Sequence, residues 1–81
     1  MELKETVEMM LSKDYKERFK AEYYQLKIRY DKLFNIFMKY NSGQLDFMPT
    51  CPQSTYSLQL KSMQDYMAIL EARAKMEGIE L

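Results

Sequence analysis

The chain has 81 residues, 47% of them apolar, and its 12 basic and 12 acidic side chains give a formal net charge of zero. This balance gives no support to a polycation that binds DNA or anionic membranes through charge alone, so a nucleic-acid role is disfavoured. The chain has no histidine and two glycines, which excludes the imidazole base, the common zinc sites and the glycine-rich phosphate loop, so we expect no catalytic residue, no metal and no cofactor.

Residues 3–11 are expected to form a short amphipathic helix. Leu3, Val7, Met10 and Leu11 recur on one helical face, and three glutamates lie on the other. The segment is acidic and no apolar core follows it, so we expect no secretory signal, and no apolar run reaches the roughly 18 residues of a membrane span. These features predict a cytoplasmic protein, whose first helix is a flap over its own hairpin or over a neighbouring subunit.

Residues 14–41 predict one long helix. Asp14 is the expected N-cap, with Glu17 at the capping-box distance, and Gly43 is placed to end the helix in a left-handed conformation. Large apolar residues follow each other at alternating steps of four and three, as in a coiled-coil seam. These seam residues are Phe19, Tyr23, Leu26, Tyr30, Leu33, Phe37 and Tyr40.

Residues 42–51 predict an irregular loop, and residues 52–77 predict a second long helix. We expect Pro52 at its first position, where a missing N–H costs nothing, and Gly78 at its end, with Ile79 in apolar contact just beyond. The loop's apolar side chains are expected to cover the closed end of the hairpin: Leu45, Phe47 and Met48. The seam spacing recurs in the second helix at Tyr56, Leu60, Met63, Met67, Leu70 and Ala74.

The two matching seams predict an all-α fold, a single domain over residues 1–81. They should pack as an antiparallel helical hairpin with coiled-coil-like contacts, Tyr40 beside Tyr56 and Tyr23 beside Ala74. At this size one core supplies only about 3 to 5 kcal/mol, and neither disulfides nor metals can supplement it, so we expect a homo-oligomer. The candidate oligomer interface is the apolar stripe outside the seam: Ile28, Phe34, Met38, Leu58, Ile69 and Met76.

Charge is distributed unevenly along the chain. Residues 13–39 carry eight basic and four acidic side chains, a net charge of +4, and both flanks are acidic. We interpret this pattern as a basic helix packed against an acidic one, rather than as a site for a charged ligand.

A polar cluster is expected towards the open end of the hairpin. Arg18, Glu22, Gln25 and Arg29 follow each other at helical spacing, and Arg73 reaches the same level from the other helix. The cluster is either salt-bridge lacing or a pocket between subunits, in which guanidinium groups hold phosphates and tyrosines stack on a base. The candidate ligand-binding residues are Arg18, Glu22, Tyr23, Tyr24, Gln25, Arg29, Tyr66 and Arg73.

Three stretches of the chain carry a resemblance to known proteins: DYKERFKAEYYQL at residues 14–26, Cys51-Pro52 before the second long helix, and LEARA with EGIEL in residues 70–81. Over nearly its whole length the chain resembles small helical proteins of unassigned role that are encoded by tailed phages and prophages of gut and Gram-positive bacteria. The resemblance implies context and brings no catalytic residue. Proteins of this type include sponges that oligomerise and sequester cyclic nucleotides or cyclic ADP-ribose derivatives of bacterial immune systems.

Two functional hypotheses follow. The first is a non-enzymatic, self-associating protein that sequesters such a signal in the infected bacterial cell and so inhibits antiphage defence, with Arg18, Arg29 and Arg73 on the phosphates. The second is a helical protein–protein interaction module, whose methionine-rich outer face binds a host or phage protein. Replacing Met67 or Met76 by lysine should weaken binding under the second hypothesis.

Overall fold

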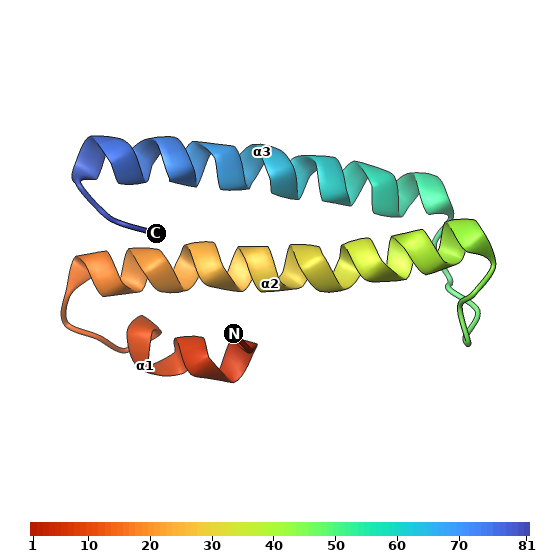
Figure 1. Cartoon of the computed structure of the whole chain (residues 1–81), viewed down its shortest axis with the longest axis horizontal. Coiled ribbons are helices and arrows are strands. Elements are labelled where there is room, and N and C mark those ends of the chain that lie inside the picture. The colour runs from red at the N-terminus through yellow and green to blue at the C-terminus, as the bar shows by residue number, and fades with distance from the viewer.

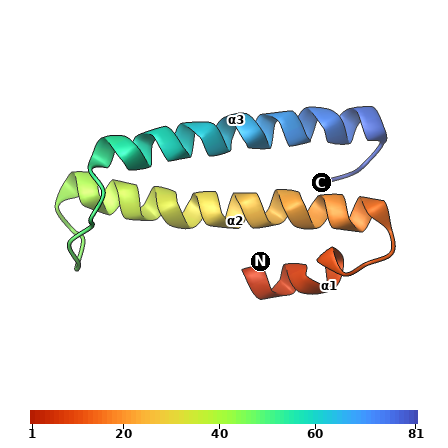
Figure 2. The ribbon, with the colours of Figure 1, turned by 180° about the vertical axis from the view of Figure 1, so that it is seen from behind.

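The computed structural model describes residues 1–81 and contains helices and turns with no strand. A 3-10 helix, η1 (Leu3–Thr6), continues into α1 (Val7–Met10), and two long helices follow, α2 (Tyr15–Ser42) and α3 (Gln53–Glu77). The long helices form an antiparallel hairpin, and the N-terminal segment lies on the side of α2 that faces away from α3 (Figure 1). The reverse view shows the same order of layers (Figure 2). The all-α class and the three packed helices are thus confirmed.

Helix α2 has well-defined signals at both ends. The Asp14 side chain accepts a hydrogen bond from the backbone N–H of Lys16 at 3.0 Å, as expected for an N-cap. The reciprocal capping-box bond to Glu17 is absent, because the Asp14 N–H donates instead to the Ser12 hydroxyl at 3.0 Å. At the other end Gly43 has φ +72°, a left-handed conformation that disfavours residues with a Cβ.

Helix α3 begins one residue later than predicted, at Gln53 rather than at Pro52. Pro52 is the N-cap rather than the first helical residue, and no side chain caps this end. At the C-terminus Gly78 has φ +70°, and the Ile79 N–H donates to the Ala74 carbonyl at 2.8 Å. The chain then folds back between α3 and α2 (Figure 1), which buries Ile79 as the helix-end contact predicts.

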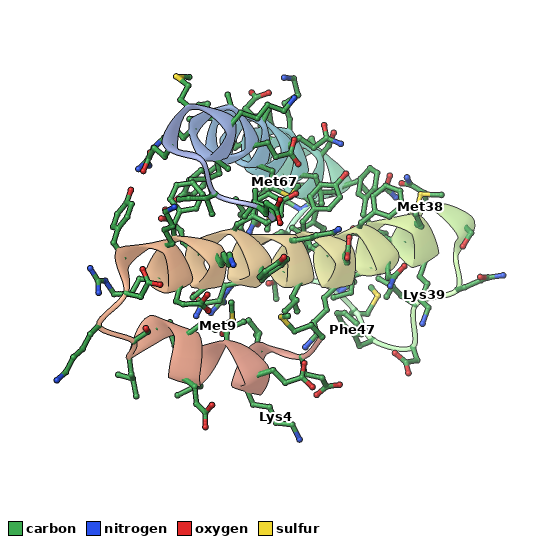
Figure 3. All side chains as sticks on the ribbon, turned by 60° about the vertical axis from the view of Figure 1, so that its left-hand side comes forward. Lys4, Met9, Met38, Lys39, Phe47 and Met67 are labelled. Atoms are coloured by element: carbon green, nitrogen blue, oxygen red, sulfur yellow. The ribbon has the colours of Figure 1, made fainter.

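The hydrophobic core lies at the open end of the hairpin. Only eight of 81 residues are buried, and five of them form one cluster. These five are Phe19, Tyr23, Leu70, Ala74 and Ile79. Met67 packs against the cluster and lies between the two helices (Figure 3), whereas at the closed end the Tyr40 and Tyr56 rings meet edge to face at 6.2 Å. The core is therefore small and one-sided, and the closed end relies on partly exposed aromatic pairs.

The N-terminal segment buries a different face from the expected one. Thr6 is fully buried, its hydroxyl donates to the Leu3 carbonyl at 2.7 Å, and Ala21 of α2 is also fully buried. Val7 and Leu11 remain 43% and 78% exposed, so the expectation that they form the packed face is wrong. The small threonine, whose hydroxyl is already hydrogen-bonded, permits a closer helix approach than a stripe of large side chains would. Met9, which is half-buried, lies between this segment and α2 (Figure 3).

The loop does not cover the closed end as expected. Leu45 is half-buried, but Phe47 is 50% exposed and Met48 is 92% exposed. The loop spans the ends of two adjacent helices, and no further element lies there to receive its side chains (Figure 3).

Candidate functional site

Hydrogen bonds between tyrosine and glutamate join the two long helices. The Tyr23 hydroxyl donates to Glu71 at 2.6 Å from the partly buried seam. Two more such pairs lie along one side of the hairpin: Tyr15 with Glu77 at 2.7 Å, and Tyr66 with Glu22. The three ion pairs, in contrast, each join residues of the same helix: Lys20–Glu17 in α2, and Lys61–Asp65 and Arg73–Glu77 in α3. Salt bridges therefore do not lace α2 to α3, and the carboxylates that could have neutralised α2 accept from phenols instead.

These contacts shift the acidity of the phenols. The hydrogen bond to Glu71, together with burial, raises the pKa of Tyr23 to about 12. The bonds to Glu77 and Glu22 likewise raise the pKa of Tyr15 and the pKa of Tyr66 above the ordinary value. All three hydroxyls consequently remain protonated donors at neutral pH.

Arg73 is held at the surface by three groups. Its Nη2 donates to the Tyr15 hydroxyl at 2.9 Å, its Nε donates to Glu77 at 3.2 Å, and its Cζ lies 5.0 Å from the centroid of the Phe19 ring. The bond to Glu77 raises the pKa of Arg73, while the bond from Tyr15 lowers the pKa of Glu77. This arrangement fixes the guanidinium plane and leaves Nη1 without a protein acceptor.

Five of the predicted ligand residues share one side of the hairpin, the arginine face: Arg18, Glu22, Arg29, Tyr66 and Arg73. The three residues of α2 recur at steps of four and seven, so they lie on one helical surface, and the Tyr66–Glu22 contact joins it to α3. Arg18 Nη1 donates to the Ser12 carbonyl at 2.9 Å, whereas Arg29 is exposed and makes no side-chain bond. The Tyr66 side chain is 43% exposed, which leaves its ring accessible beside these cations.

The profile of the Sequestin family matches residues 13–76, which include α2, the loop and nearly all of α3. The chain belongs to the Sequestin family. The matched region contains the whole arginine face and leaves out the N-terminal segment. Neither the comparison with curated proteins nor the comparison with solved structures gives a match.

The other three predicted ligand residues of this Sequestin-family chain lie elsewhere. Tyr23 is 8% exposed within the seam, and Tyr24 packs edge to face on it at 5.6 Å, from the side opposite Glu22. Gln25 lies beneath the N-terminal segment, where its amide donates to the Thr6 hydroxyl at 3.0 Å. The sequence spacing grouped these three residues with the arginine face. In the structure the two tyrosines pack in and beside the seam, and Gln25 bonds the N-terminal segment.

The predicted oligomer residues fall into three separate patches. Leu58, Ile69 and Met76 lie on the outer side of α3 and are 71%, 59% and 80% exposed. Phe34 and Met38 lie on the flank of α2 and are 41% and 50% exposed. Ile28 is half-buried and lines a hollow of about 210 Å³ with Met1 and Tyr24. The outer side of α3 is therefore the most exposed of the three.

Four shallow hollows mark the surface, with volumes of about 210 to 260 Å³, and none is lined by an arginine. None of them was anticipated from the sequence. One lies beside the stacked rings of Tyr30 and Phe34, 5.9 Å apart, and the Gln64 amide donates to the Tyr30 hydroxyl at its rim, at 2.6 Å. The sequence signal for it was the placement of Phe34 outside the seam. The arginine face of a single copy is consequently an open surface rather than a pocket.

The charge of α2 is not balanced by its neighbour. Helix α2 carries seven basic and three acidic side chains, a net charge of +4, while α3 carries three of each and is neutral. Six of the seven cations of α2 have no carboxylate within 4.0 Å. The expectation of a basic helix on an acidic one is therefore wrong for the hairpin, and α2 keeps an uncompensated positive field.

Two further features concern metals and membranes. No three cysteine, aspartate or glutamate side chains come together in a way that could hold a metal ion. None of the helices combines the length and the apolar character that crossing a bilayer requires.

Proposed function

We propose that this chain binds and sequesters a small, nucleotide-derived anionic signal without turning it over. The observation that carries the proposal is the arginine face. There Arg18 and Arg29 of α2, a helix with an uncompensated charge of +4, share one side of the hairpin with Arg73 and the accessible Tyr66 ring of α3. Membership of a family named Sequestin supports a binding role rather than a catalytic one. The ligand class that fits is a cyclic nucleotide or a cyclic ADP-ribose derivative, and capture of a host immune signal of this kind would inhibit antiphage defence in the cytoplasm of the infected cell.

The residues of the arginine face suit the parts of such a ligand. Guanidinium groups bind phosphate oxygens through paired N–H donors. The Arg29 side chain and Nη1 of Arg73 make no hydrogen bond within the protein, so a phosphate could bind them without breaking one. The exposed Tyr66 ring offers a stacking surface for a base, because its hydroxyl is already held by Glu22. The second oxygen of Glu22 can accept from an amine or a ribose hydroxyl.

Self-association is part of the proposal. The arginine face of one copy is open, whereas ligand sites usually surround most of the ligand's surface. A second copy would close the site and would also enlarge a core of only eight buried residues. We therefore propose a homo-oligomer that encloses its ligand between subunits.

Native mass spectrometry tests the proposal directly. The protein is measured alone and with a panel of cyclic dinucleotides and cyclic ADP-ribose isomers, and a discrete oligomer should gain one ligand mass in a fixed ratio. Arg29→Ala should lower the affinity about 10-fold to 100-fold, since a hydrogen bond to a charged group contributes about 1.5 to 3 kcal/mol. Lys27→Ala is the matched control, because it removes the same charge from a different side of α2 and should change affinity much less. An oligomer that takes up no member of the panel would contradict the proposal.

Arg73 requires a separate control, because it also contacts Tyr15, Glu77 and Phe19. Arg73→Ala should abolish binding while leaving the helical circular dichroism spectrum unchanged. Tyr15→Phe removes the neighbouring structural bond but no guanidinium, so it should retain most of the affinity. Equal losses in the two variants would show that Arg73 acts by supporting the open end rather than by binding the ligand.

One observation favours the alternative of a protein partner. Met76 and Met48 are 80% and 92% exposed, and flexible methionines suit an adaptable docking surface. Met76→Lys tests it, because a helical partner should be lost in that variant. Met67→Lys cannot serve, since Met67 packs against the core and a lysine there would disturb the fold.

A further inference from the structure

The outer side of α3 carries a second regular stripe. Its residues follow each other at steps of four and three along the side turned away from α2: Leu58, Ser62, Asp65, Ile69, Ala72 and Met76. All six are exposed, and the three large apolar side chains are 59% to 80% exposed. This α3 stripe therefore has the pattern of a helix–helix seam without a partner in the single chain.

We propose that a second copy packs its own α3 stripe on this one, antiparallel and centred on Met67. In this register Leu58 faces Met76 of the second copy, Ser62 faces Ala72, and Asp65 faces Ile69. Each pair occurs twice by symmetry, as in an isologous two-fold interface. Leu58 and Met76 then meet at both ends, and the small Ser62 and Ala72 meet inside them, where they permit close approach of the helices. The two Asp65–Ile69 pairs lie at the centre.

The charges favour this arrangement over the alternatives. In a parallel pair each stripe residue would face its own copy, so the two Asp65 carboxylates would oppose each other. In the antiparallel register Asp65 faces an isoleucine, and Lys61 of its own helix neutralises it at 2.9 Å. Association through α2 would bring two charges of +4 together, whereas α3 is neutral. A copy of this chain is thus better accommodated on α3 than on α2.

The register also has a consequence for the arginine face, which rests on the proposed function. Tyr66 and Arg73 flank the α3 stripe on one side, and the two-fold axis places both copies of that side on the same surface. The two Tyr66 side chains would lie within one helical turn of each other along the axis. The two Arg73 side chains would lie about 18 Å apart along the helices, 12 residues at 1.5 Å each. The dimer would thereby form one continuous groove from two open arginine faces.

Disulfide cross-linking without ligand tests the register. In a Cys51→Ser background, Ser62→Cys and Ala72→Cys are made as separate variants, mixed and oxidised. The mixture should form a covalent dimer, because these positions face each other, while neither variant alone should do so, since equal positions lie about 15 Å apart along the helices. Cross-linking of either variant with itself, or no cross-linking in the mixture, would overturn the proposal.

Sedimentation equilibrium provides a second test that needs no cysteine. Ile69→Glu should raise the dimer dissociation constant at least about 30-fold, because the new carboxylate would face Asp65 of the second copy at the centre of the interface. Met48→Glu is the matched control on the loop and should leave the constant unchanged. A monomeric wild-type protein, or an Ile69→Glu variant that associates normally, would overturn the proposal.

A ligand measurement separates the two proposals. Cyclic di-AMP and cyclic ADP-ribose are titrated into the wild type, into Ile69→Glu and into the charge-matched control Met48→Glu. Weaker binding to Ile69→Glu than to Met48→Glu supports a groove formed by both copies, and equal binding to these two variants overturns it while the proposed function stands. Absence of binding to any of the three proteins contradicts the proposed function, and the cross-linking result then decides the dimer alone.

Discussion

At the residue scale, the phenol hydroxyls do what charged pairs were expected to do. Tyr23, at 8% exposure, is the most buried of them, and its bond to Glu71 crosses the seam. A phenol loses less on partial burial than an ammonium group does, because it stays neutral. Tyrosines at seam positions therefore join the helices without desolvating a cation, and the arginines are left for other contacts.

Tyr23→Phe should lower the free energy of unfolding by about 0.5 to 1.5 kcal/mol near neutral pH. This is the net contribution of one hydrogen bond, since the Glu71 carboxylate would be hydrated in the variant. The variant should also change the alkaline dependence. Because the pKa of Tyr23 is about 12 in the folded chain and 10.0 is its ordinary value, the bond contributes fully below pH 10 and is lost as pH rises towards 12. Thermal melts followed by circular dichroism across this range measure the effect.

Tyr15→Phe is the matched control, since Tyr15 makes the same kind of bond at an exposed site. Tyr15→Phe should lower the free energy of unfolding by less than Tyr23→Phe does. It should also keep most of the decrease in stability that the wild type shows between pH 10 and pH 12. Identical alkaline curves for the wild type and Tyr23→Phe would show that the Tyr23 bond does not distinguish the folded from the unfolded chain.

The sequence could predict these residues only in part. Seam spacing places Tyr23 between the helices, but it does not say that Glu71 accepts from it, because spacing defines a face and not a hydrogen-bond partner. Gln25 illustrates the same limit. Its spacing joins it to Arg18 and Arg29, yet the N-terminal segment packs over it and takes its amide.

At the element scale, local signals determine where the helices end. Gly43 and Gly78 could both be assigned from sequence, because a glycine after a periodic segment fits the left-handed residue of a helix C-terminus. The face buried by η1 and α1 could not, since hydrophobicity favoured Val7 and Leu11 while the packing distance favoured Thr6. Short helices have few positions, so one close contact outweighs their apolar pattern.

Gly78→Ala should lower the free energy of unfolding by about 1 to 2 kcal/mol, the cost of a left-handed conformation for a residue with a Cβ. No heavy atom lies within 4 Å of a Cβ built there, so the effect is one of backbone conformation alone. Urea denaturation measures it. Gly43→Ala is equally unhindered but adjoins an exposed loop that can adjust, so it should cost less. If Gly78→Ala left the free energy of unfolding unchanged, the burial of Ile79 would not depend on the left-handed conformation at this helix end.

At the scale of the whole molecule, the chain is built in three layers with most of its core between two of them. The family match covers the hairpin and leaves out residues 1–12, which lie on the back of α2. The hairpin topology could be predicted from sequence, because two seams of equal spacing are joined by one loop. The packing of the N-terminal segment on its own α2 could not be predicted, because the same sequence pattern permits packing on a neighbouring copy.

Removing residues 1–11 should therefore leave a folded hairpin of lower stability. Ser12 is retained, because it accepts from both Arg18 and the Asp14 N–H. The deletion exposes Ala21 and frees the Gln25 amide, and we expect a loss of about 1 to 3 kcal/mol, or about 4 to 8 °C in Tm per kcal/mol for a domain of this size.

Two controls give this deletion its meaning. Leu11→Ser changes a side chain that is already 78% exposed and should leave the Tm unchanged. Thr6→Ala keeps the segment but removes the hydroxyl that Gln25 and Leu3 share, so it should reproduce part of the loss. If the deletion abolished cooperative unfolding, the segment would belong to the core rather than cover it. If the deletion left the Tm unchanged, contact with α2 would contribute no stability, and the segment would be available to pack on a second copy.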